Sequence, residues 1–220
     1  MRGDRPRPPR SVWIAGRIVS STVALAPWSW PLMSAGVERF FDRAALDWDS
    51  RTETGTPTHL EPLATAVLEE GPVPERILEV GCGTGEGALF LAREFPRASV
   101  RGIDISGEMI RRATRKIGLD PDARVAFRVG DAATVPWPSE SFDLVAQINM
   151  PVFFSEISRV LRPGGRVIVT SSMGEQTPFF TPTRLLNRQF KKVGLEPEGS
   201  GRTGSGTWFI AKKRAAAHGS

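Results

Sequence analysis

A run of alternating glycines is the part of this sequence best suited to hold a ligand. It reads Glu79-Val80-Gly81-Cys82-Gly83-Thr84-Gly85 and follows directly on a short apolar stretch. Glycines at alternate positions let the backbone turn sharply and come close to a ligand, and a helix that follows presents free N–H groups. Asp104 ends the next apolar stretch about twenty residues later, the spacing at which an acid accepts both hydroxyls of a ribose. The pattern predicts a site for a nucleotide-like ligand.

The segments around this loop alternate short β-branched runs with helical stretches, which is typical of a parallel sheet with crossover helices. We expect strands over residues 76–80, 99–104, 125–129, 142–148 and 167–170, and helices over 60–69, 85–95 and 107–116. Ser106 is the expected N-cap of the last of these helices. Pro151 is expected near the first turn of a further helix, and Arg162-Pro163-Gly164-Gly165 is expected to turn the chain into the fifth strand.

The pattern changes after the fifth strand. A helix over 183–193 precedes a glycine-rich stretch, 199–206, which we interpret as a turn, and a last strand over 208–211. The turn is too short for a helical crossover, so the end of the domain is predicted to be an antiparallel hairpin. The loop itself admits a second interpretation, because Gly83, Gly85 and Ala88 also fit the G-x-G-x-x-A fingerprint of dinucleotide-dependent dehydrogenases.

Four segments in the same order resemble the class I S-adenosylmethionine-dependent methyltransferases, in particular the small-molecule group called type 11. They are Ile77-Leu78-Glu79-Val80-Gly81-Cys82-Gly83-Thr84-Gly85, Gly102-Ile103-Asp104-Ile105-Ser106, Gly130-Asp131-Ala132 and Arg159-Val160-Leu161-Arg162-Pro163-Gly164-Gly165. A dehydrogenase has no need of the last two. The resemblance implies an α/β, Rossmann-like doubly wound fold. Its seven-stranded, mostly parallel sheet would have the order 3-2-1-4-5-7-6 and an antiparallel last strand, and its cofactor would be S-adenosyl-L-methionine.

The resemblance also assigns roles to matching residues. Glu79 would hold the loop or meet the ammonium group of the cofactor, Gly81, Cys82, Gly83 and Gly85 would form the cradle for its methionyl part, and Asp104 would bind the ribose. Ile105 would lie against the adenine face, while Asp131 and the Ala132 backbone would read the adenine edge. Asp131 is otherwise a turn residue, and Cys82, with no histidine near it in the sequence, is interpreted as a packing residue rather than a nucleophile.

Three further residues carry open alternatives. Trp48, in the aromatic and acidic segment 40–49, is a candidate lid over the cofactor or an anchor that holds a helix to the core. His59 is a weak candidate for a proton acceptor, with helix capping or surface exposure as the alternative. Asn149 would contact the cofactor, or would hold a target amine in an RNA or protein amine methyltransferase. No catalytic residue is assigned, because orientation alone can drive transfer from a sulfonium.

The sequence before the domain divides into a basic, disordered leader over 1–10 and an N-terminal helical cover or lid over 11–57; the methyltransferase domain spans 58–213 and a tail follows over 214–220. Residues 18–37 lack charge over a bilayer-spanning length, but prolines and polar residues argue against a span. Pro27 is poorly placed behind the signal-peptide-like Ala24-Leu25-Ala26. An amphipathic helix with Trp28, Trp30, Leu32 and Met33 as apolar contacts is expected, with weak membrane-surface contact through 11–33 as the alternative.

Composition narrows the functional classes. Of the net charge of +5, the first twenty residues carry +4, so the body of the chain is nearly neutral and nucleic acid is an improbable partner. Cys82 is the single cysteine and two histidines form no cluster, which favours a cytoplasmic protein without a metal site. The prediction is a methyltransferase with an unidentified small-molecule acceptor, and a non-catalytic S-adenosylmethionine-binding module as an alternative.

Overall fold

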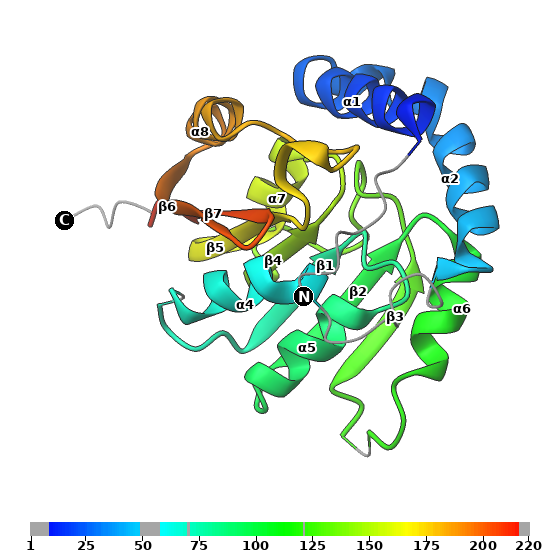
Figure 1. Ribbon diagram of the computed structural model, residues 1–220. Helices are drawn as coiled ribbons and strands as arrows, with labels where there is room; N and C mark the ends of the chain where they lie inside the picture. Colours follow the sequence, from blue (N-terminus) through cyan, green and yellow to red (C-terminus); the bar gives the residue numbers. More distant parts are fainter. Residues whose placement is uncertain (1–8, 49–57, 70, 121, 216–220) are drawn as a thin grey trace.

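A seven-stranded twisted sheet forms the centre of the molecule, with helices on both of its faces (Figure 1). The computed structural model describes residues 9–48, 58–69, 71–120 and 122–215. The strands are β1 (Arg76–Val80), β2 (Ser99–Asp104), β3 (Val125–Val129), β4 (Phe142–Ile148), β5 (Leu161–Ser171), β6 (Leu195–Thr203) and β7 (Gly206–Lys213). Their order is β3-β2-β1-β4-β5-β7-β6, and β7 runs antiparallel to both of its neighbours. The predicted sheet order is confirmed.

The helices surround this sheet in three groups. They are α1 (Arg10–Leu25), α2 (Pro31–Ala45), α4 (Glu61–Leu68), α5 (Glu86–Glu94), α6 (Gly107–Arg115), α7 (Phe154–Val160) and α8 (Thr183–Lys192), with short 3-10 turns η1 (Pro27–Ser29), η2 (Thr58–Leu60) and η3 (Gly174–Gln176). Helices α4, α5 and α6 cover one face of the sheet, and α7 and α8 cover the other (Figure 1). The N-terminal pair α1 and α2 lies beside the edge where the parallel strands end (Figure 1).

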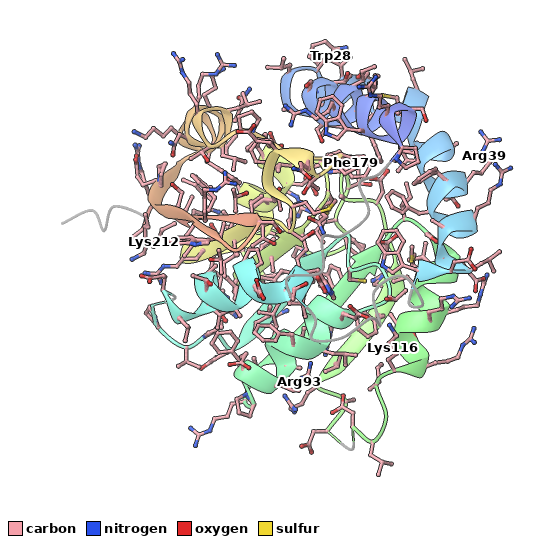
Figure 2. The ribbon with its side chains drawn as sticks, in the orientation of Figure 1. Trp28, Arg39, Arg93, Lys116, Phe179 and Lys212 are labelled. Carbon is pink, nitrogen blue, oxygen red and sulfur yellow. The ribbon has the colours of Figure 1, made fainter. Side chains whose placement is uncertain are left out.

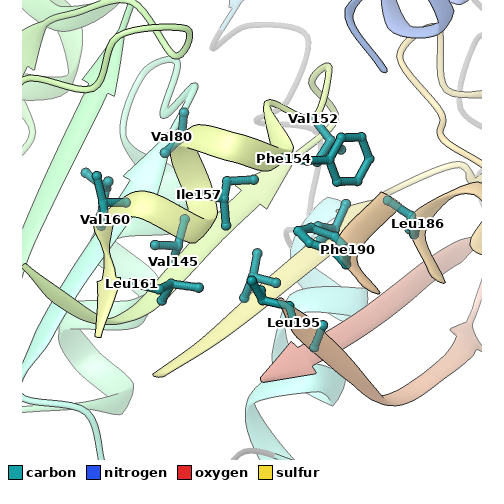
Figure 3. Close-up of a cluster of buried hydrophobic side chains, with 14 of the residues drawn as sticks. Val80, Val145, Val152, Phe154, Ile157, Val160, Leu161, Leu186, Phe190 and Leu195 are labelled. Carbon is teal, nitrogen blue, oxygen red and sulfur yellow. The ribbon is translucent and has the colours of Figure 1, made fainter. Parts of the chain in front are cut away.

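Alternating strand residues supply two separate cores. In β1, Ile77 packs into the core under α4 and α5, whereas Leu78 and Val80 pack into the core under α7 and α8. Figure 3 shows the second core, where Phe154 of α7 meets Phe190 of α8 edge to face, with ring centroids 4.8 Å apart. Both faces of β1 are apolar because helices cover both, as expected for a buried parallel sheet.

The predicted glycine-rich turn is wrong in its extent. Gly199 and Gly201 belong to β6, and the reversal between β6 and β7 is confined to Gly204 and Ser205. A Cβ atom on Gly201 would lie 2.8 Å from the ring of Trp208 on the neighbouring strand. These glycines make room for a cross-strand indole, and a sequence pattern does not distinguish that use of glycine from a turn.

Two other local predictions need adjustment. Arg162-Pro163-Gly164-Gly165 lies within β5 as a bulge, because Phe142 pairs with Leu161 while Leu144 pairs with Arg166. Pro151 lies three residues before α7, which begins at Phe154, and is not in its first turn.

The N-terminal cover consists of two helices and not one. Pro27 and Pro31 each lie at the start of a helix. Proline is tolerated there because a backbone N–H at this position would have no intrahelical hydrogen-bond partner. Trp30 is buried as predicted and Met33 is partly buried, but Trp28 and Leu32 are 79% and 90% exposed, so their predicted packing is wrong. The cover as a separate unit stays a prediction, and its residues 49–57, like the leader 1–8 and the tail 216–220, lie outside the described residues.

Contacts with the segment after β5 hold α1 in place. Arg17 donates from Nη1 to the carbonyl of Phe180 at 2.8 Å, and Gln189 of α8 donates from Nε2 to the carbonyl of Ala24 at 3.0 Å. Gly16 lies so close to Pro178 that a Cβ atom on Gly16 would be 2.5 Å from the Cβ of Pro178. Among the described residues, no helix has the length and apolar composition needed to cross a membrane.

Two glycine substitutions test this packing. Gly36 in α2 has open space where a Cβ would be, so Gly36→Ala should raise the free energy of unfolding by up to about 1 kcal/mol through helix propensity. Gly16→Ala should lower it, because the added methyl forces α1 away from Pro178. Urea unfolding of both variants measures the difference. Equal stabilisation by the two substitutions would contradict the close contact of α1.

Candidate functional site

The glycine loop between β1 and α5 combines a tight turn with one open position. Gly81, Gly83 and Gly85 have φ angles of +69°, +52° and +84°, which other residues rarely adopt. No heavy atom lies within 4 Å of the Cβ position of Gly83, so a ligand can approach the backbone there. Gly85 serves packing instead, because its Cβ position lies 2.7 Å from Phe127. Gly81 is covered by the side chain of Met150.

Asp104, at the end of β2, joins the loop to α6. Its Oδ2 accepts the Gly83 amide and its Oδ1 accepts the Ser106 amide, both at 2.9 Å. Ser106 is the N-cap of α6, as predicted: its Oγ accepts the Met109 amide and donates to Oδ1 of Asp42 in α2 at 2.6 Å. Burial raises the pKa of Asp104; the amide bonds oppose that shift and the charge of Asp42 adds to it.

Glu79 forms the buried base of the loop. Its side chain is 1% exposed and bonds to the backbone of Ala88 in α5, passing over Gly87, whose missing Cβ leaves room for it. Its Oε2 has no hydrogen-bond partner among the described residues. Burial raises the pKa of Glu79 well above its ordinary value, and the charges of Asp104 and Glu86 contribute to that rise. An unpartnered carboxylate oxygen of this kind suits a cationic group on a ligand.

Asp131, which follows β3, bonds to the N-terminal cover. Its two carboxylate oxygens lie 2.9 and 2.8 Å from Nε1 of Trp30, which donates to them, and Oδ1 also accepts the Ala133 amide. Trp30 packs edge to face on Phe153, with centroids 5.1 Å apart. Asp131 is therefore a turn residue and an anchor for the cover, and its predicted role at the adenine edge stays a prediction. The contact of Asp131 with Trp30 was not predicted from the sequence.

The apolar side chains around Trp30 include two that were predicted to contact the cofactor. Ile105 and Ala132 pack, with Met150, against the cluster that Trp30 forms with Val23 and Phe153. The structure therefore brings the predicted adenine neighbours to one place, beneath α1 and α2. Their contact with adenine stays a prediction.

Asn149, after β4, has a structural role at the next strand end. Its Nδ2 donates to Oγ of Ser172 at 2.9 Å, and its Oδ1 accepts the Ser172 amide at 2.7 Å. Its φ of +55° is one that asparagine tolerates better than most residues. Because Ser172 occupies both ends of the amide, this geometry does not favour Asn149 as a holder of a target amine.

His59 and Trp48 lie at two different borders of the site. His59 lies beside Glu86 at the start of α5, with Nε2 and Oε2 2.6 Å apart. Trp48 contacts Phe41 edge to face at 6.0 Å, and Phe41 contacts Phe179 at 5.9 Å. These contacts support the anchoring interpretation of Trp48; its action as a lid stays a prediction.

Cys82 lies inside the loop and is 6% exposed. Burial raises the pKa of its thiol well above the ordinary value, with the charge of Glu79 contributing. A thiol that resists ionisation is a poor nucleophile, so the geometry agrees with a packing role.

The fold and this edge define a Rossmann-like domain suited to a nucleoside-containing cofactor. Residues 77–165 match the family described as "Methyltransferase domain". A fatty-acid O-methyltransferase of Mycolicibacterium smegmatis is 38% identical over 105 residues, 44% of this chain and 37% of that protein. A demethylmenaquinone methyltransferase of Symbiobacterium thermophilum is 32% identical over 146 residues, 60% of this chain and 57% of that protein. The crystal structure of the cyclase SpnF has a TM-score of 0.65 at 20% identity, covering 82% of this chain and 96% of that one.

The chain carries a class I S-adenosylmethionine-dependent methyltransferase domain, similar to the type 11 small-molecule group, as the four motifs predicted. It spans between 37% and 57% of the length of these two curated relatives. Three features of the site fit the cofactor of this family: the open face of Gly83, the partly buried carboxylate of Asp104, and the Oε2 of Glu79, which has no partner in the part of the chain that the structure describes. Dependence on a dinucleotide is not supported.

Replacement of Glu79 by glutamine tests whether the buried charge of Glu79 destabilises the folded protein. A carboxyl whose pKa is raised by folding stabilises the protein below its unfolded pKa, and this contribution is lost as the pH rises through the folded pKa. Glu79→Gln should therefore have a higher Tm than the wild type at pH 8, and the difference should vanish toward pH 4. The exposed Glu94→Gln is the control for the change in net charge. A lower Tm for Glu79→Gln at pH 8 would show that the charge is stabilised in the folded state.

Proposed function

We propose that this protein transfers the methyl group of S-adenosylmethionine to a small organic acceptor. The observation that carries the proposal is the open backbone at Gly83, whose amide bonds to the carboxylate of Asp104, in a loop that has the buried carboxyl of Glu79 at its base. The names of the two relatives, a fatty-acid and a demethylmenaquinone methyltransferase, support small-molecule acceptors in this group. The acceptor atom is left open by this proposal.

The residues of the chain would act by binding and orientation. The cofactor supplies a methyl group on a positively charged sulfur, which is already a good electrophile, so alignment of an acceptor with that bond accounts for much of the acceleration. Glu79 would meet the ammonium group and Asp104 the ribose hydroxyls, while α1 and α2 would exclude water. His59 is paired with Glu86 and Asn149 with Ser172, so neither is assigned as a base.

Two alternatives are less well supported. The amine methyltransferase needs Asn149, whose amide is bonded to Ser172. A binding module without methyl transfer would keep the same cradle. The cyclase SpnF has a similar fold, so the fold alone does not identify the reaction. Formation of methylated product distinguishes that module from an enzyme. A cytoplasmic location stays a prediction that depends on the single cysteine.

Calorimetric titration with S-adenosylmethionine, S-adenosylhomocysteine and NADH tests the cofactor. The first two should bind with micromolar affinity and NADH should not bind. Asp104→Ala should weaken binding by about 1 to 3 kcal/mol through loss of a buried partner. Ser106→Ala is the matched control, because it removes the helix cap and the bond to Asp42 but leaves the Asp104 carboxylate. Equal losses in both variants would argue against ribose binding by Asp104, and binding of NADH alone would refute the proposed function.

We also propose a weak contact between residues 11–33 and an anionic membrane surface. Ile14, Ile18 and Leu25 lie on one exposed side of α1, and Trp28 and Leu32 project beyond it; Figure 2 shows Trp28 pointing away from the domain. Helix α8, which contacts the end of α1 through Gln189, carries arginines 184 and 188 on its exposed side. Apolar side chains beside cationic ones suit an interface with anionic lipid.

Cosedimentation with phosphatidylglycerol vesicles tests this contact. The double variant Trp28→Ser, Leu32→Ser should lose most of the bound fraction, because two large apolar side chains no longer enter the interface. Leu119→Ser is the control, since Leu119 is also fully exposed but lies in the loop between α6 and β3. Equal binding of the wild type and the double variant would refute the contact.

A further inference from the structure

A cavity of about 410 Å³, open to solvent on one side, lies between the two helices of the cover, and lining residues such as Ser11 and Gly36 are exposed. Helix α1 contributes Val12 and Val19, helix α2 contributes Met33 and Val37, and Phe41 and Phe179 also line it. Within the described residues, no charged side chain lines this cavity. Its volume lies in the range of small-molecule sites, and its lining suits a nonpolar ligand.

Glycine is one reason that this space is open. Gly36 lines the cavity from α2, and no heavy atom lies within 4 Å of its Cβ position. Glycine inside a helix is less stable than alanine, so a glycine here lowers the stability of α2 although no neighbouring atom would meet a Cβ. A longer side chain at this lining position would enter the space between α1 and α2.

The cavity shares a wall with the predicted cofactor edge. Val19, Met33 and Val37 line the cavity and also pack against the cluster of Trp30, whose other neighbours include Ile105 and Met150. Met150 in turn covers Gly81 of the glycine loop. Side chains that line the cavity therefore also belong to the cluster that borders the predicted cofactor edge.

We propose that this cavity binds the nonpolar chain or ring of the methyl acceptor, with the reacting atom directed toward the strand ends. The inference rests on the proposed function and adds the substrate class: an acceptor with a substantial uncharged, apolar portion. Ser11 supplies the single polar side chain of the lining, and a polar ligand group placed against the apolar remainder would lose its hydrogen bonds to water without replacement. The cavity therefore selects against charged or strongly polar groups in this portion of the acceptor.

Gly36→Leu tests the cavity directly. The leucine side chain has room for its Cβ and would fill the space between the helices, so α2 should still fold. Ala35→Leu is the matched control, because Ala35 is the exposed neighbour of Gly36 and is not part of the lining. The probe is the uncharged fluorophore N-phenyl-1-naphthylamine, with displacement by 1-dodecanol, and S-adenosylmethionine affinity is measured separately on the same variants.

Wild type and Ala35→Leu should bind the probe equally, and Gly36→Leu should bind it at least tenfold more weakly, while all three bind S-adenosylmethionine equally. Unchanged probe affinity in Gly36→Leu, or no probe binding by the wild type, would overturn the assignment of the cavity. Absence of S-adenosylmethionine binding in a wild type that binds the probe through Gly36 would instead refute the proposed function, so the two failures are distinguishable.

Discussion

One partly buried carboxylate, that of Asp104, determines the geometry of the ligand-binding edge. It accepts amides from Gly83 and Ser106, so the conformation of the glycine loop and the start of α6 depend on the same side chain. Through the hydroxyl of Ser106 the connection continues to Asp42 of α2. A charge withdrawn from water is tolerated only when hydrogen bonds replace the water it has lost, and here those bonds come from the glycine loop and from the residue that caps α6. The loop and the cover are therefore positioned by one network.

Negative charge gathers at this edge and is only partly compensated. His59 pairs with Glu86, and the indole of Trp30 donates to Asp131. The carboxyl groups of Glu79 and Asp104 accept hydrogen bonds from backbone amides. Burial raises the pKa of both groups, and the charge of Asp104 raises the pKa of Glu79 further. Such a site is less stable empty than it would be with a cation beside these carboxylates. S-adenosylmethionine carries an ammonium and a sulfonium, which is a charge complement to this edge.

The parts of the fold that the sequence predicted well are those determined by neighbouring residues. The bounds of β1, β3 and β4, and the cap of α6 by Ser106, follow from alternation and capping within a few positions. The bond from Trp30 to Asp131 joins residues 101 positions apart, and no local pattern pairs an indole with a particular acid. Glycine was ambiguous for the same reason: in β6 it makes room for Trp208, and in α2 it opens a cavity, although the residue type is the same.

The similarity to known methyltransferases and the proposed acceptor cavity occupy different parts of the chain. The matched family segment, residues 77–165, contains the glycine loop, Asp104 and Asp131 but none of the residues that line the cavity, which come from α1, α2 and Phe179. A cofactor shared by many enzymes requires the same contacts in each, whereas the acceptor differs from one enzyme to the next. Substitutions between α1 and α2 can therefore change the acceptor while Asp104 continues to fix the cofactor loop, and the two helices are where selectivity for the acceptor is expected to be encoded.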